Sequence, residues 1–327
     1  MTRYVYDFDE PSEGGRDLLG GKGVGLAEMT QLGIPVPAGF TITTDASRAF
    51  MASGGEVEGL DEEVAEHIAR LEQQTGKRFG DPEDPLLVSV RSGAAVSMPG
   101  MMDTILNVGL NDVSVGGLAA STKNERFAYD CYRRLIEMYG ETVDDVHNRR
   151  FDADRESPAD AIERLRATYR EGTGSDFPQD PREQLHHAIV AVFESWQSPR
   201  AQAYRRMYEI PDDVGTAVNI VQMVFGNKGD NSGTGVAFTR DPSTGEQGLY
   251  GEFLTNAQGE DVVAGSARRS RSSAWRRACP APSSSSRQPC GASRSTTGTC
   301  RTRNSRSRRG SSTCCRPGRR SGRRPRH

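Results

Sequence analysis

The sequence is short of cysteine and of long apolar runs, and both absences exclude classes of protein. No stretch of 18 apolar residues occurs, and the first ten residues, MTRYVYDFDE, lack the apolar segment of a signal peptide. Before Ser266 the chain holds one cysteine, Cys131, so this part has no disulfide framework. We therefore expect a cytoplasmic protein with no membrane partner.

Acidic residues and lysine are absent from the last 62 residues, Ser266–His327. This tail also lacks Val, Ile, Leu, Met, Phe and Tyr, yet it holds 18 of the 42 basic residues, all of them Arg. All 44 acidic residues come earlier, so the formal charge of −2 combines −20 in residues 1–265 with +18 in the tail. A segment with so few apolar side chains cannot bury a core, and we predict that 266–327 is disordered.

The stretch Leu86–Asp103 combines an apolar run with a charge and a glycine loop. Its first five residues, Leu-Leu-Val-Ser-Val, predict a strand buried on both faces. Arg91 is expected at the end of that strand, before a loop that contains Gly100. A fixed cation followed by such a loop favours an anion such as phosphate. A structural strand with a capping Arg and an ordinary turn remains the alternative.

A second glycine-rich stretch, Gly20–Gly25, surrounds Lys22. Apolar residues at helical spacing follow it, so we expect a helix to begin near Gly23. A cation beside a helix N-terminus favours phosphate. The spacing is not that of a P-loop, and a simple turn remains the alternative.

The rest of the chain alternates between helical and strand patterns. In the segment 60–75, Leu60, Val64, Ile68 and Leu71 predict one buried helix face, and His67 is expected on the surface. Further helices are predicted at 124–139, 161–169 and 182–196, and later strands at 217–225, 233–239 and 249–254.

Several stretches in order resemble one family: GGKGVGLAEM, LLVSVRSGAAVSMPGMMDTILNVGLND, SGTGVAFTRDPSTGEQGLYGEFL and NAQGEDVVAG. Together they are similar to the N-terminal nucleotide-binding domain of the pyruvate, phosphate dikinase family, from Met1 to about Gly265. The resemblance implies an α+β fold of ATP-grasp type, with two α/β subdomains and a helical insertion, incomplete and followed by the disordered tail. The implied parts are 1–110 for the first subdomain, 111–212 for the insertion, 213–265 for the second subdomain and 266–327 for the tail.

The resemblance also implies a reaction. In the family ATP binds with Mg²⁺ between the two subdomains, and its β-phosphate passes to a histidine on a separate domain. That phosphohistidine converts pyruvate to phosphoenolpyruvate, while inorganic phosphate takes the γ-phosphoryl group. We expect no catalytic residue in this chain, because the phosphohistidine domain and the dimer-forming barrel are not encoded. We therefore expect little activity from the chain alone and no homodimer.

The matching motif positions imply eight residues that contact ATP. No metal ligand is assigned, because the family's Mg²⁺ ligands are expected beyond Gly265. The eight are Lys22 and Arg91 at the phosphates, Gly100 and Met102 in a loop that closes over them, Arg134 at a further phosphate, Gln222 at the adenine hinge, and Thr234 and Gly235 in a glycine turn.

The tail departs from the family pattern, which continues after QGEDVVAG with a branched residue and Arg-Thr-Pro. Codons for 266–272 written TCC GCA CGC CGG AGC CGA TCG encode Arg-Thr-Pro-Glu-Pro-Ile when read in a shifted frame. Suitable codons for 309–318 give Gly-Lys-Leu-Tyr-Leu-Leu-Gln-Thr-Arg in the same frame, which resembles the end of the family domain. We predict a frameshift near 263–267, which leaves the expected Mg²⁺ ligands out of frame.

Three other readings stay open. A phosphoenolpyruvate synthase-like fragment would share the architecture, although the helical stretch 111–200 favours the dikinase. A nucleotide-binding module without transfer activity would share the site. A nucleic-acid-binding protein would use the basic tail, but the absence of lysine argues against it, and we expect no specific nucleic acid partner.

Overall fold

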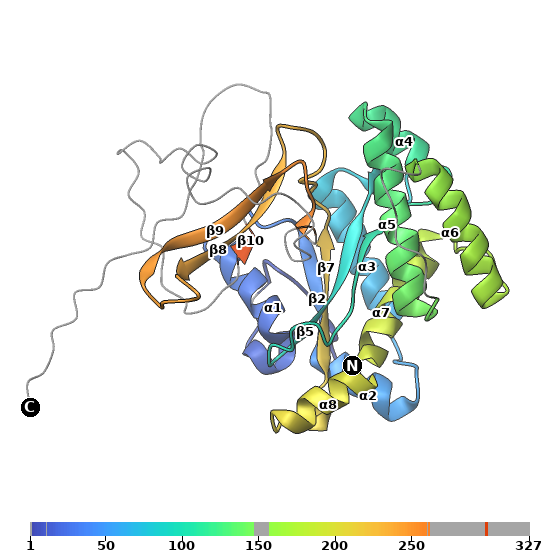
Figure 1. The fold of residues 1–327 in the computed structure, drawn as a ribbon. Coiled ribbons are helices and arrows are strands. Elements are labelled where there is room, and N and C mark those ends of the chain that lie inside the picture. The colour runs from blue at the N-terminus through green and yellow to red at the C-terminus, as the bar shows by residue number, and fades with distance from the viewer. Residues whose placement is uncertain (1, 11, 147–156, 260, 262–297, 300–327) are drawn as a thin grey trace, which may run out of the picture. The chain divides into compact units, whose positions relative to one another are not determined.

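The computed structural model describes residues 2–10, 12–146, 157–259, 261 and 298–299 (Figure 1). The chain divides into two compact units, Met1–Met223 and Val224–His327. We predicted the second subdomain to begin at 213, but the strand over 216–222 belongs to the sheet of the first unit. The difference arises because that strand pairs along its length with two strands from the N-terminal half.

A five-stranded antiparallel sheet forms the centre of the first unit. Its three inner strands are buried along nearly all of their length. In sheet order the strands are β1 (Val5–Asp7), β2 (Gly39–Ile42), β7 (Thr216–Gln222), β5 (Val88–Ala94) and β6 (Thr104–Val108).

Strand β5 corrects one expectation about Arg91. We predicted Arg91 at the end of a strand over 86–90, but β5 starts at Val88 and continues through Ala94. The small residues after Arg91 stay in the ladder because β7 pairs with β5 from Val88 to Ala94. Arg91 therefore projects from the middle of the sheet. Leu86 belongs instead to a short parallel pair of strands, β3 (Arg78–Phe79) and β4 (Pro85–Leu86).

Helices cover both faces of this sheet. Helix α1 (Gly15–Gln31) packs on β5 and β7, and α7 (Pro181–Ser195) lies across the sheet from it (Figure 1). Gly20 interrupts α1 with φ 68° and ψ 173°, so its second segment begins directly after Gly20, slightly before the predicted start near Gly23.

The predicted helical region beyond 111 contains five helices among the described residues. Four of them begin with a side chain that accepts a hydrogen bond from the first turn, and three of these four have Pro at the start. Besides α7, they are α4 (Ser114–Thr122), α5 (Glu125–Val143), α6 (Pro158–Thr173) and α8 (Pro199–Met207), and the short 3₁₀ helix η1 (Asp212–Val214) follows.

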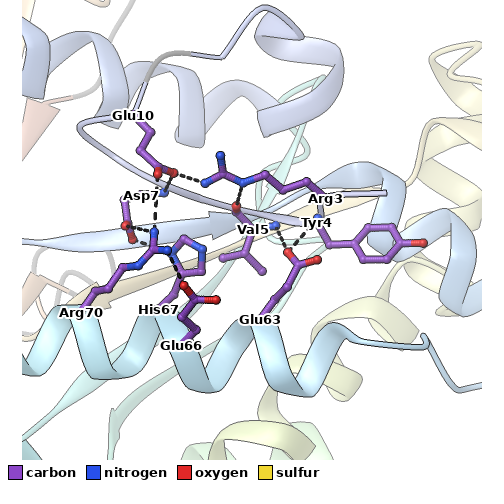
Figure 2. Close-up of polar contacts among 9 residues, drawn as sticks. All are labelled: Arg3, Tyr4, Val5, Asp7, Glu10, Glu63, Glu66, His67 and Arg70. Carbon is purple, nitrogen blue, oxygen red and sulfur yellow. Dashed lines mark hydrogen bonds and ion pairs between the residues drawn. The ribbon is translucent and has the colours of Figure 1, made fainter. Parts of the chain in front are cut away.

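Helix α3 (Leu60–Thr75) confirms the predicted apolar face but corrects His67. His67 is 3% exposed, and its Nδ1 lies 2.7 Å from Oδ1 of Asp7 in β1 (Figure 2). Glu63 in the first turn accepts hydrogen bonds of 2.9 Å from the amides of Tyr4 and Val5. The edge strand thus runs along α3 and covers the position expected on the surface. Helix α2 (Thr44–Ser53) follows β2 and packs on β7.

The described part of the second unit is mainly a hairpin of β8 (Gly233–Arg240) and β9 (Gln247–Thr255). Asp241 shapes its turn by accepting hydrogen bonds from the amides of Ser243 and Thr244. A two-residue strand, β10 (Gly298–Thr299), pairs with β8, which departs from the disorder expected at those positions. The remainder of the predicted disordered tail lies outside the described residues.

The mixture of helices and sheets agrees with the predicted α+β class. None of the helices in the described ranges has the length and apolar character needed to cross a membrane.

Candidate functional site

The glycine-rich turn of α1 lies directly on the central sheet. A Cβ atom on Gly20 would stand 1.4 Å from the carbonyl oxygen of Gly93 in β5. A Cβ on Gly23 would stand 2.9 Å from Oγ1 of Thr41 and 3.2 Å from Oδ1 of Asn219. Only glycine fits at this approach, so the glycines bring the backbone on either side of Lys22 onto β5 and β7.

Arg91 projects from the face of the sheet that α1 covers. It is the cross-strand partner of Asn219, which in turn pairs with Thr41, and paired residues project to the same side. Thr41 Oγ1 donates to Asn219 Oδ1 at 3.0 Å, beneath Gly23. The guanidinium of Arg91 is partly buried, and its Nε donates to Ser89 Oγ at 3.1 Å. Arg91 and the turn of α1 therefore meet on one face.

The charges of Lys22 and Arg91 act on each other. Lys22 keeps a large accessible surface, yet many protein atoms surround its ammonium group. This desolvation, followed by the charge of Arg91, lowers the pKa of Lys22 to about 8. Within the described ranges Lys22 has neither a hydrogen-bond nor an ion-pair partner. Two like charges held close together, one of them unpaired, form a site suited to an anion.

The Ser97–Asp103 loop connects β5 to β6 and exposes its apex. Gly100 has φ 72°, and a Cβ there would meet nothing within 4 Å. The amide of Met101 donates to the carbonyl of Met98 at 3.2 Å, whereas those of Gly100 and Met102 find no acceptor in the described chain. Met98 is buried against Trp196 and Ala201. The loop is thus anchored at its base and offers two amide donors near its apex.

The other four predicted residues lie elsewhere. Arg134 is on α5, where its Nε donates to Asp130 at 2.9 Å. Gln222 ends β7, and its amide donates to the carbonyl of Ala38 at 2.9 Å, just before the first unit ends. Thr234 and Gly235 occupy β8 of the second unit, where the hydroxyl of Thr234 is buried and has no hydrogen-bond partner among the described residues.

The structure thus brings Lys22 and Arg91 together, while ATP contacts at Arg134, Gln222, Thr234 and Gly235 stay predictions. No cluster of three or more His, Cys, Asp or Glu suited to a metal occurs among the described residues. We therefore assign no Mg²⁺ ligand there.

Comparison with known proteins decides the family. The pyruvate phosphate dikinase, AMP/ATP-binding domain family matches residues 16–62 and 56–273. The chain belongs to this family. The resemblance inferred from the sequence is thereby confirmed.

Curated relatives agree with this assignment. They include pyruvate, phosphate dikinases from Clostridium symbiosum (55% identical over 284 residues) and Giardia intestinalis (53% over 290), and the chloroplastic pyruvate, phosphate dikinase 1 of Arabidopsis thaliana (52% over 274). The matches cover 81%, 81% and 78% of this chain and 32%, 33% and 28% of the relatives. The chain therefore spans about a third of the length of these relatives.

Sequence reasoning missed two residues beneath the family's glycine turn, Thr41 and Asn219. Asn219 stands in the apolar strand sequence TAVNIVQ and is 1% exposed. A polar residue inside a buried run is itself a signal, because its side chain needs a partner there. Arg200, which contacts the Ser97–Asp103 loop, lies in a polar stretch, so nothing in the local sequence sets it apart.

Proposed function

We propose that this chain is the ATP-binding part of a pyruvate, phosphate dikinase, with an ATP-grasp type of fold. The observation that carries the proposal is the pair of cations Lys22 and Arg91 on the face covered by the glycine turn. Phosphoryl transfer depends mainly on positioning and on neutralising charge at the phosphates. This arrangement supplies both through side chains and backbone.

Each part of the site takes a role in binding ATP. Lys22 and Arg91 hold the phosphates, and the amides of Gly100 and Met102 close over them from the Ser97–Asp103 loop. Gln222, at the end of the first unit, contacts the adenine. Arg134, Thr234 and Gly235 add contacts to the phosphates or nucleotide. Mg²⁺, when bound, neutralises phosphate charge through oxygen ligands.

The complete reaction follows from the family. ATP, pyruvate and phosphate give AMP, phosphoenolpyruvate and diphosphate through a phosphohistidine on another domain. The proposal therefore assigns this chain nucleotide binding and phosphate positioning, in the cytoplasm, and not the transfer to pyruvate. We expect no homodimer of this chain.

Titration calorimetry with ATP tests the binding role. We expect Lys22→Met and Arg91→Ala each to weaken ATP binding roughly 10- to 100-fold, because each removes a charge-assisted hydrogen bond. Lys123→Met is the matched control, since Lys123 is an exposed lysine at the end of α4. Because the pKa of Lys22 is about 8, affinity should also fall as pH rises from 7 to 9, and this fall should be smaller in Lys22→Met. Equal affinity in all variants would refute the assignment.

A further inference from the structure

Helix α8 contacts the Ser97–Asp103 loop through the side chain of Arg200. Its Nε donates to the carbonyl of Met101 at 3.2 Å, and the same guanidinium forms an ion pair with Asp103. One side chain therefore links a carbonyl next to the loop apex with a carboxylate at the loop end. The side chain of Arg200 is half exposed and that of Asp103 is mostly covered.

A second contact lies one helical turn further along α8. The hydroxyl of Tyr204 donates to the carbonyl of Ser97 at 3.5 Å, at the other end of the loop. Residues four apart lie on the same helix face, so Arg200 and Tyr204 hold the two ends of the loop from one side. Between them Met98 is buried against Trp196 and Ala201. Helix α8 thus contacts the loop at Ser97 and Asp103, its two ends, and at the buried side chain of Met98.

Helix α8 is itself firmly fixed. Arg205 is 1% exposed, its Nε donates to Asp212 at 2.8 Å, and its guanidinium lies 4.3 Å from the centre of the Trp196 ring. Trp196 Nε1 donates to the carbonyl of Asp212 at 2.9 Å. These contacts tie the residue that ends α7 and the last turn of α8 to Asp212 in the segment after α8, so the helix is held at both ends.

We propose that Arg200 is a positioning residue that holds the Ser97–Asp103 loop with the amides of Gly100 and Met102 ready for a phosphate. The inference rests on the proposed function, because it presumes that the loop binds phosphate. Arg200 acts through the carbonyl of Met101 and the carboxylate of Asp103, not through the nucleotide. Without these two contacts the apex keeps only the packing of Met101 and Met102 against the buried cluster of Met98, and its direction is less fixed because the space beside Gly100 is open.

Hydrogen exchange of the full 327-residue chain without nucleotide tests whether Arg200 holds the Ser97–Asp103 loop. In Arg200→Ala we expect the amide of Met101, which is hydrogen-bonded to the carbonyl of Met98, to exchange about three- to tenfold faster, because local opening of the loop becomes easier. Arg206→Ala is the matched control, since Arg206 is an exposed arginine on the same helix with no hydrogen bond or ion pair to the described residues. Arg200→Lys should give an intermediate rate, because an ammonium group lacks the planar fork that bridges two acceptors.

The outcomes separate this inference from the proposed function. Unchanged exchange in Arg200→Ala, or an equal increase in Arg206→Ala, overturns the positioning role of Arg200. Because Arg200 is exposed, both variants should keep the near-ultraviolet dichroism of the parent, which confirms that they are folded. ATP affinity measured on the same proteins should fall in Arg200→Ala and stay unchanged in Arg206→Ala. A parent chain that binds no ATP refutes the proposed function, and the exchange result still decides whether Arg200 holds the loop.

Discussion

At the scale of the single residue, Gly20 shows most directly how the site depends on sequence. It combines φ 68° with an approach that leaves no room for a Cβ beside Gly93. The first property strains any other residue, and the second makes the backbones collide. The two effects can be separated, because Gly33 has φ 72° and open space around its Cβ position.

We predict that Gly20→Ala lowers the free energy of unfolding by roughly 3 kcal/mol or more and abolishes ATP binding, since the turn with Lys22 must move. Gly33→Ala should cost only about 1 kcal/mol, the strain of the left-handed conformation. Urea unfolding of both variants provides the measurement. Similar losses of stability in the two variants would show that the close approach of Gly20 to β5 contributes nothing to the cost of Gly20→Ala.

At the scale of the element, Asp7 joins β1 to α3. Burial alone would raise the pKa of the Asp7 carboxyl, but the hydrogen bonds and charges of His67 and Arg70 outweigh it and hold this pKa below its usual value (Figure 2). A carboxyl whose pKa is lower in the folded state stabilises the fold above its unfolded pKa of about 3.9. That stabilisation disappears as the pH falls through the folded pKa.

We therefore predict that Asp7→Asn costs roughly 1–3 kcal/mol of stability at pH 7, because it removes the charge that faces His67 and Arg70. Between pH 5 and pH 2 the difference from the parent should shrink. Chemical unfolding followed over that range measures it. Asp9→Asn, at an exposed neighbour, is the control and should follow the parent curve. A constant difference at all pH values would contradict the prediction.

The elements also show what sequence patterns can and cannot predict. Periodicity identified the apolar face of α3 because four residues at helical spacing are enough to define it. It failed for His67, since burial there comes from β1, about 60 residues away in the chain. Likewise, Arg91 appeared to end its strand because the pairing with β7 that extends β5 is not encoded locally.

The candidate site divides in the same way. Lys22 and Arg91 could be found because each is a cation near glycines in the sequence. At both stretches an ordinary turn remained the alternative to a phosphate site, and the family resemblance favoured the phosphate site. The support beneath them could not be found in that way. Asn219 and Arg200 act through contacts with segments more than 95 residues distant.

At the scale of the whole molecule, the distribution of charge sets the first 265 residues apart from the tail. The tail offers 18 arginines and no carboxylate, so it cannot supply acidic oxygen ligands for Mg²⁺. The shifted frame would introduce both acidic and apolar residues from Ser266 on. If the frame is shifted, the ligands for Mg²⁺ are missing from this chain, and ATP binding should respond little to Mg²⁺.

We predict that restoring the frame near 263–267 makes ATP binding tighter in the presence of Mg²⁺ by at least about tenfold, which corresponds to about 1.4 kcal/mol. The same chain ended after Gly265 is the control, because it removes the tail without adding ligands. It should bind ATP with little response to Mg²⁺, as the 327-residue chain should. Weak binding that depends steeply on salt and vanishes in the shortened chain would instead reflect the polycation. If the restored chain responds to Mg²⁺ no more than the other two, the missing ligands do not lie in the shifted frame.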